Sequence, residues 1–85
     1  MQDVRMIRGS SDQTVRMPFA CEALVARGDC VYGFSSDGYV MIARMGQQKV
    51  EAYNLNIRFD SVYGVSSDNI AVVGSGNSLY FVSLK

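Results

Sequence analysis

A thirteen-residue segment is written twice in this chain of 85 residues. VYGFSSDGYVMIA at 31–43 recurs thirty-one positions later as VYGVSSDNIAVVG at 62–74, and six of the first seven positions are identical. A shorter version, GSSDQTV, begins at Gly9. In each copy the Ser-Ser-Asp triplet separates two apolar runs, as the turn of a β-hairpin does. The repetition therefore predicts a chain built from related hairpin units.

One domain spanning 1–85 is predicted, with three units at about 4–28, 30–60 and 61–85. Apolar and polar residues alternate with a period of two in runs bounded by Gly, Ser, Asn and Asp, which is typical of strands. The predicted strands are 4–9, 13–20, 22–27, 30–35, 39–45, 49–55, 61–66, 69–74 and 78–84. The segment PFACEALVAR (18–27) is compatible with a helix that begins at its proline, although a strand is the prediction there.

A second alignment of the chain with itself uses an offset of thirty-nine and pairs CVYGFSSDGYVMIARM with NIAVVGSGNSLYFVSL. Such a spacing is near that of a four-stranded propeller blade. A regular run of strands matches itself when it slides by one strand and one turn, so apolar alternation does not choose between the two offsets. Identical residues favour thirty-one.

The segments GSSDQTVRM (9–17) and FSSDGYVMI (34–42) resemble the inner hairpin of a WD-repeat β-propeller blade. The resemblance implies four-stranded sheets arranged radially as a platform for other proteins. In that family the turn aspartate belongs to a hydrogen-bond network with histidine, and this chain has no histidine. The predicted structural turn residues are therefore Asp12, Asp37, Gly38 and Asp68.

The chain is too short to close a ring of four or more blades by itself. We expect an all-β fold: an antiparallel meander of about nine short strands in three repeat units, propeller-blade-like, with sheet faces that other subunits cover. The alternative is a small closed β-barrel or prism, which would bury its faces within one chain. A domain of this size buries only about 60–65% of its unfolded surface, so association would add to its stability.

Charge and hydropathy exclude several classes of partner. Eight basic residues balance eight acidic ones, which leaves no electrostatic footprint for nucleic acid. The apolar runs are too short to span a bilayer, and the first residues do not read as a secretory signal. We expect a location inside the cell or within a macromolecular or virion assembly, with no membrane partner.

Candidate catalytic groups are sparse. Without histidine the serines lack their usual base, and Lys49 and Lys85 lie at a turn and at the terminus. The acidic residues are spread singly and do not follow the alternating pattern of a calcium loop. No enzymatic activity, metal or other cofactor is predicted. Cys21 and Cys30 are predicted to be reduced thiols, with one disulfide as the alternative.

The composition favours contacts with other chains. Apolar residues make up 48% of the sequence and five residues are methionine, more than a thin β-domain easily buries. The last strand, LYFVSL, has no proline and is predicted to be an open edge that another chain can extend. The predicted partner-binding residues on it are Leu79, Tyr80, Phe81, Val82 and Leu84. Tyr32 and Tyr63 occupy equivalent repeat positions, which predicts a shared structural role.

These observations predict a non-enzymatic structural or protein-interaction subunit of a larger assembly, which docks through apolar sheet faces and an open edge strand. Its partners are then other protein chains, either copies of itself or a different protein. Two alternatives are a carbohydrate-binding module completed by oligomerisation and a small inhibitor of one target protein.

Overall fold

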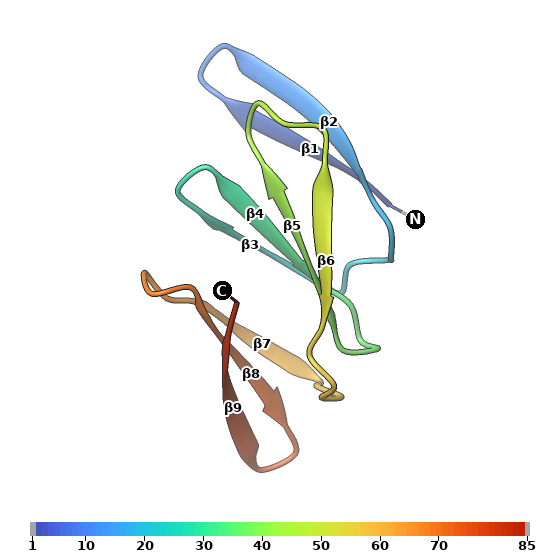
Figure 1. Cartoon of the computed structure of the whole chain (residues 1–85), viewed down its shortest axis with the longest axis vertical. Coiled ribbons are helices and arrows are strands. Elements are labelled where there is room, and N and C mark those ends of the chain that lie inside the picture. Colours follow the sequence, from blue (N-terminus) through green and yellow to red (C-terminus); the bar gives the residue numbers. More distant parts are fainter. Residues whose placement is uncertain (1, 85) are drawn as a thin grey trace.

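The computed structural model describes residues 2–84, which form nine β-strands and no helix (Figure 1). The all-β prediction is confirmed, and each predicted strand overlaps an observed one. In chain order the strands are β1 (Gln2–Arg8), β2 (Ser11–Met17), β3 (Ala23–Arg27), β4 (Cys30–Phe34), β5 (Tyr39–Arg44), β6 (Val50–Asn54), β7 (Ser61–Val65), β8 (Ile70–Ser75) and β9 (Ser78–Ser83). The helix considered for 18–27 does not form, since its second half is β3.

The strands pair antiparallel with their neighbours in sequence and make three separate sheets. We call them the N-terminal sheet (β1-β2), the central sheet (β3-β4-β5-β6) and the C-terminal sheet (β7-β8-β9). Figure 1 shows them stacked along the longest axis of the molecule, which measures 41 Å. Within residues 2–84 the strands do not close into a barrel.

The sheet boundaries differ from the three-strand units expected at 4–28, 30–60 and 61–85. β3 belongs to the central sheet, where Ala23 pairs with Phe34 and Arg27 with Cys30. The reason is local: only Gly28 and Asp29 separate the two strands, and Gly28 has a φ of +59°. A two-residue turn with positive φ forces a hairpin, so β3 pairs with the strand that follows it.

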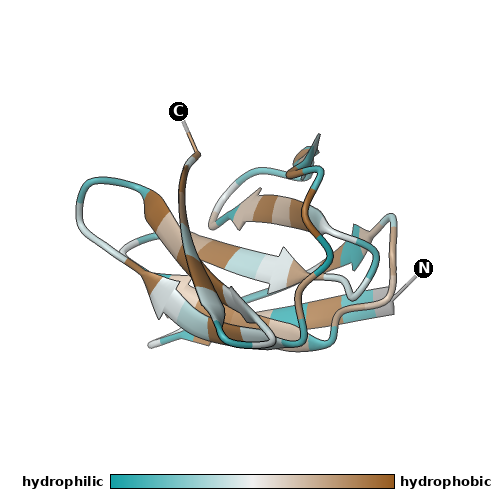
Figure 2. Ribbon diagram, turned by 90° about the horizontal axis from the view of Figure 1, so that it is seen from below, coloured by the Kyte–Doolittle hydropathy of each residue, from teal (hydrophilic) through white to brown (hydrophobic). Residues whose placement is uncertain are grey.

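Two apolar clusters hold the stack together, one on each face of the central sheet. Val40 and Ile42 of β5 point toward the C-terminal sheet, where they meet Ala71 and Val73 of β8. The alternate residues of β5, among them Met41, point toward the N-terminal sheet. Because both sets of residues are apolar, strands of the stack carry continuous hydrophobic stretches (Figure 2). The two middle strands of the central sheet, β4 and β5, are thus mostly buried on both faces, as strands between two layers are.

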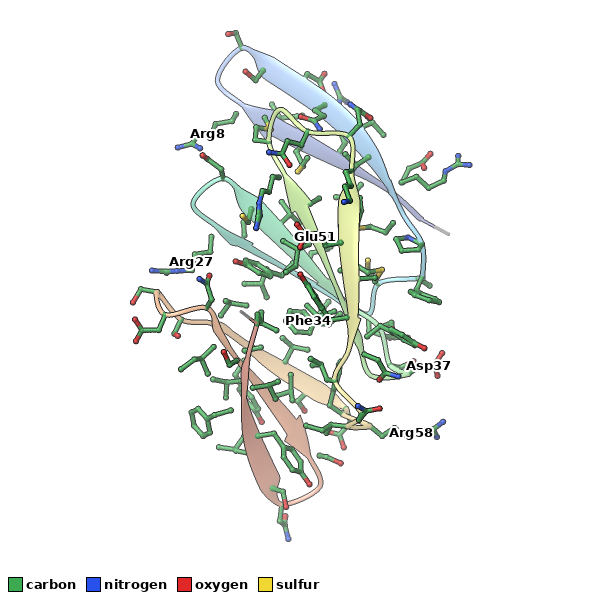
Figure 3. The ribbon with its side chains drawn as sticks, viewed as in Figure 1. Arg8, Arg27, Phe34, Asp37, Glu51 and Arg58 are labelled. Carbon is green, nitrogen blue, oxygen red and sulfur yellow. The ribbon has the colours of Figure 1, made fainter. Side chains whose placement is uncertain are left out.

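Phe34 marks the middle of this interior. Its side chain is fully buried between the central and C-terminal sheets (Figure 3), with the ring of Phe59 edge-on at 6.0 Å between centroids. Phe59 comes from the connection between β6 and β7 and fastens that connection to the core. Edge-to-face aromatic pairs of this kind contribute about 0.5–1.5 kcal/mol beyond their buried area.

The spatial repeat of the sheets is close to thirty-nine residues. In the central sheet Phe34 lies between Ala23 and Val40, and in the C-terminal sheet Gly74 lies between Ser61 and Leu79. Matching backbone bonds precede the first strand of each sheet: Glu22 N–H donates to the carbonyl of Phe34 at 2.7 Å, and Asp60 N–H donates to that of Gly74 at 2.9 Å. β3 also contacts β7, and β2 contacts β6, so corresponding strands lie next to each other.

The thirty-one-residue repeat survives as a repeated turn. Ser35 N–H donates to the carbonyl of Tyr39 at 2.9 Å, and Ser66 N–H donates to that of Ile70 at the same distance. The first turn joins β4 to β5, whereas the second joins β7 to β8. The chain therefore uses one turn sequence at two different places in its sheets, and identical residues report the turn and not the position in the stack.

Candidate functional site

The predicted edge strand is β9, which lies at one side of the C-terminal sheet. Its side chains alternate between the two faces of that sheet. Tyr80 and Val82 pair with residues of β8 that face the core, so they lie on the covered face. Leu79 and Phe81 lie on the opposite face, with 57% and 70% of their surface exposed. Leu84 follows the strand and packs, partly buried, against the core.

Tyr63 joins Leu79 and Phe81 on this exposed face. The sequence repeat predicts a role shared with Tyr32, but Tyr32 is 4% exposed and Tyr63 is 67% exposed. Both tyrosines point to the same side of their sheets, since Val62 before Tyr63, like Val31 before Tyr32, packs on the opposite side. Tyr32 is buried because the C-terminal sheet covers it, whereas no strand among residues 2–84 covers Tyr63. The repeat alone does not reveal this difference, because it does not show which sheet has a further neighbour.

Gly74 makes room for the ring of Tyr63. A Cβ placed on Gly74 would lie 3.0 Å from Cε2 of Tyr63, so the tyrosine lies over β8 on this side of the sheet. Val72 of the same strand pairs with Phe81. We call the surface formed by Tyr63, Val72, Leu79 and Phe81 the front face of the C-terminal sheet. It carries apolar side chains and one phenol, and no charged side chain.

The front face of the C-terminal sheet corresponds to a covered face of the central sheet. By pairing register, Val72 of the C-terminal sheet matches Tyr32 of the central sheet, and Leu79 matches Val40. Tyr32 and Val40 are buried under the C-terminal sheet. Ile42, which matches Phe81, is buried there as well. No strand among residues 2–84 covers the C-terminal sheet in the same way. The stack therefore ends on a surface of the kind that elsewhere in the molecule receives another sheet.

The backbone of β9 is also open. Leu84 N–H donates to the carbonyl of Asn69 at 2.8 Å, on the side of β8. Because hydrogen-bonded residues alternate along an antiparallel pair, Val82 N–H points to β8, and the N–H groups of Phe81 and Ser83 point outward. Within residues 2–84 no strand accepts these outward groups.

The predicted turn residues fall into two groups. Asp37 and Gly38 lie in the turn before β5, where Gly38 has a φ of +96°, and Asp68 lies in the matching turn before β8. Asp12 lies within β2, opposite Ile7, and not in a turn. The turn there contains only Gly9 and Ser10, two residues fewer than the turns at 35–38 and 66–69, so the strand has already begun at Asp12.

Asp12 instead belongs to a charged surface at the other end of the stack. Arg5 Nε donates to Asp12 Oδ1 at 2.9 Å, and Arg16 Nε donates to Asp3 Oδ1 at 2.8 Å. These bonds from the guanidinium groups lower the pKa of both carboxyls. All four side chains are exposed on the outer face of the N-terminal sheet. The two ends of the stack thus differ in chemistry, one charged and one apolar.

The cysteines lie on opposite faces of the central sheet. Cys21 packs against the cluster shared with the N-terminal sheet and Cys30 against the cluster shared with the C-terminal sheet, and no disulfide joins them. Burial raises the pKa of the Cys21 thiol. Among the described residues, no group of three or more Cys, Asp or Glu gathers as a metal site would require.

The fold and this surface define a class: a small all-β protein of stacked antiparallel sheets whose C-terminal sheet exposes an apolar face. Comparison with protein-family models, with curated proteins and with solved structures finds no match for the chain. None of the helices that a membrane span would require occurs in the part of the chain that the structure describes.

Proposed function

We propose that the protein is a non-enzymatic structural or interaction subunit, and that the front face of the C-terminal sheet and the edge of β9 bind a β-sheet of another protein chain. The proposal rests mainly on one observation, the correspondence between this exposed face and the covered face of the central sheet. A face with the same place in the repeat and similar apolar chemistry is suited to the same kind of cover.

The size of the exposed side chains supports this function. Burying a Leu or Phe side chain contributes about 1.5–3 kcal/mol, so covering Leu79, Phe81 and Tyr63 would supply several kcal/mol toward association. Aromatic residues are also the type most often found at the energetic centre of interfaces. The outward N–H groups of Phe81 and Ser83 can also pair with a strand of the partner, which would fix the orientation of the partner along β9.

Substitution of the front face tests the proposal. Phe81→Glu places a charge at the centre of the surface and should abolish co-purification of the partner from the native source. Thr14→Glu, on the exposed face of the N-terminal sheet, is the matched control and should leave it unchanged. Equal recovery of the partner with both variants would contradict the proposal. Binding to a glycan array that Phe81→Glu abolishes would assign the face to a carbohydrate-binding module.

A further inference from the structure

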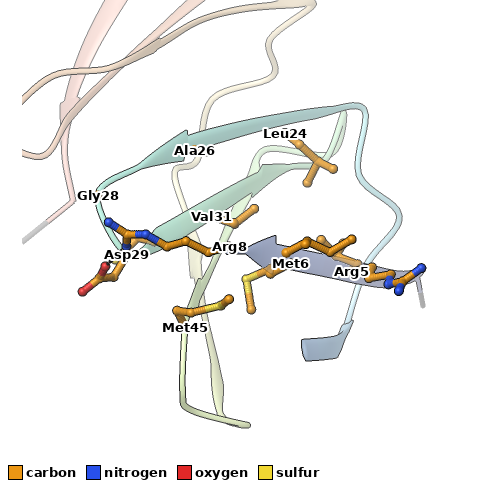
Figure 4. Close-up of a pocket in the computed structure, with 12 residues that line it drawn as sticks. Arg5, Met6, Arg8, Leu24, Ala26, Gly28, Asp29, Val31 and Met45 are labelled. Carbon is orange, nitrogen blue, oxygen red and sulfur yellow. Dashed lines mark hydrogen bonds and ion pairs between the residues drawn. The ribbon is translucent and has the colours of Figure 1, made fainter. Parts of the chain in front are cut away.

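A groove beside β1 is the second uncovered apolar surface of the molecule (Figure 4). It encloses about 360 Å³ between the free edge of β1 and the strands β3 and β4. Leu24, Ala26 and Val31 line it on the central sheet, and Met6 lines it on β1. Leu24 is 49% exposed, although Met41, on the same face farther along the sheet, is fully buried.

The groove exists because the N-terminal sheet has two strands where the central sheet has four. β1 and β2 cover the half of the central sheet that contains Met41 and Ala43. The other half, with Leu24 and Ala26, has no strand over it among the described residues. A strand placed beside β1 would extend the N-terminal sheet across this half.

The edge of β1 is able to pair with such a strand. Arg8 and Ser11 pair across a two-residue turn, which makes them a hydrogen-bonded pair. Since bonded pairs alternate along the ladder, the N–H groups of Arg5 and Ile7 point away from β2 and toward the groove. At one end, Arg8 forms an ion pair with Asp29, and both side chains are exposed.

The C-terminal sheet has the right face for this groove. The N-terminal sheet turns Val4 and Met6 toward the central sheet, and the central sheet turns Val40 and Ile42 toward the C-terminal sheet. Leu79 and Phe81 are the matching residues of the C-terminal sheet. If the C-terminal sheet of another chain extended the N-terminal sheet sideways, with the matching faces on the same side, its Leu79 and Phe81 would therefore lie on the central-sheet side of the groove.

We propose that the occupant is the C-terminal sheet of a second copy of this chain, with its β9 beside β1, so that Phe81 of one copy covers Leu24 of the next. This inference rests on the proposed function and identifies its partner. β9 carries no charged residue, and Leu24, Ala26 and Val31 of the groove are apolar. Arg8 and Asp29, which also line the groove, pair with each other at one end. Stacking the front face instead on the outer face of the N-terminal sheet would bury the ion pairs Arg5–Asp12 and Arg16–Asp3, which is unfavourable.

The contact joins two different surfaces, so it is heterologous. Each copy then carries one donor surface at β9 and one acceptor groove at β1, and association continues until a ring closes or a filament grows. The average molar mass of the assemblies then depends on protein concentration. This behaviour differs from that of a two-fold dimer, in which the same face meets itself.

Complementation between two variants tests the inference. Phe81→Glu removes the donor and keeps the groove, whereas Leu24→Glu removes the groove and keeps the donor. Sedimentation velocity over a concentration series should show growing assemblies for the wild type and for the control Thr14→Glu. Each glutamate variant alone should associate at least tenfold more weakly. An equimolar mixture of the two should form a 1:1 complex and no larger species, because only one productive contact remains.

The outcomes separate this inference from the proposed function. If Phe81→Glu blocks association and Leu24→Glu does not, the front face is an interface but the groove is not its acceptor, and the inference is overturned. A wild type that stays monomeric at millimolar concentration also overturns it, while the co-purification of another protein still tests the proposed function. Should either glutamate variant fail to fold by circular dichroism, Phe81→Gln and Leu24→Gln replace them, with the same expected pattern.

Discussion

The hydroxyl of Tyr32 donates a hydrogen bond of 3.3 Å to Oδ1 of Asn69, and so links the central sheet to the turn that begins β8. Asn69 has a φ of +61°, in the turn position that Gly38 occupies in the other copy. The side chain that tolerates this backbone also supplies the acceptor. One residue thus shapes the turn and joins two layers.

Removing this bond should reveal its contribution through a double-mutant cycle. Tyr32→Phe is expected to lower the free energy of unfolding by about 0.5–1.5 kcal/mol. Asn69→Gly keeps the positive φ and removes only the acceptor, so it isolates the bond from the backbone. Urea unfolding of both single variants and the double variant should show that the two effects are not additive. Strict additivity would mean that the bond contributes nothing.

Acid should loosen the N-terminal sheet first. The pKa of Asp3 and the pKa of Asp12 are both lowered by their bonds to Arg16 and Arg5. A carboxyl whose pKa is lowered on folding stabilises the folded state at pH values above its ordinary pKa of 3.8. This stabilisation is lost as the pH falls from 3.8 through the pKa of the folded state. Chemical shifts of β1 and β2 should therefore change below about pH 4 before those of β5. Asp3→Asn with Asp12→Asn should remove that difference.

Two glycines should respond differently to alanine. Gly76 has a φ of +60° and open space around its Cβ position, so Gly76→Ala should cost about 1–2 kcal/mol for the backbone alone. A Cβ on Gly38 would in addition lie 2.6 Å from the carbonyl oxygen of Ile57. Thermal unfolding should show the larger loss for Gly38→Ala. Equal losses would mean that the connection before β7 moves aside at little cost.

Proline substitutions at two positions of β9 should distinguish its outward N–H groups from those that bond to β8. Ser83 N–H points outward, so Ser83→Pro should block strand addition and leave the melting temperature nearly unchanged. Val82 N–H points to β8, so Val82→Pro should lower the melting temperature as well. Association measured beside a thermal melt distinguishes the two effects. A Ser83→Pro variant that associates like the wild type would mean that β9 binds through its side chains only.

Strand positions were predictable because period-two alternation and turn residues act locally. β3 illustrates the limit: its pairing with β4 depends on a two-residue turn, and a division by repeat units places it in the wrong sheet. Tyr63 illustrates another limit: it points to the same side of its sheet as Tyr32, and the presence of a further sheet decides which of the two is covered. The edge residues of β9 were visible in the sequence as an uncharged final strand. The groove at Leu24 was not, since it depends on how many strands the neighbouring sheet contains.

The nearest-neighbour pairing of all nine strands has a consequence for how the molecule opens. No described backbone ladder crosses from one sheet to another, so each sheet can lose its hydrogen bonds without breaking those of the next. Hydrogen exchange should then occur in three cooperative units, slowest in the central sheet, whose middle strands β4 and β5 are mostly buried on both faces. A partner laid on β9 or in the groove would slow exchange at the ends of the stack, and so turn the least protected layers into interior ones.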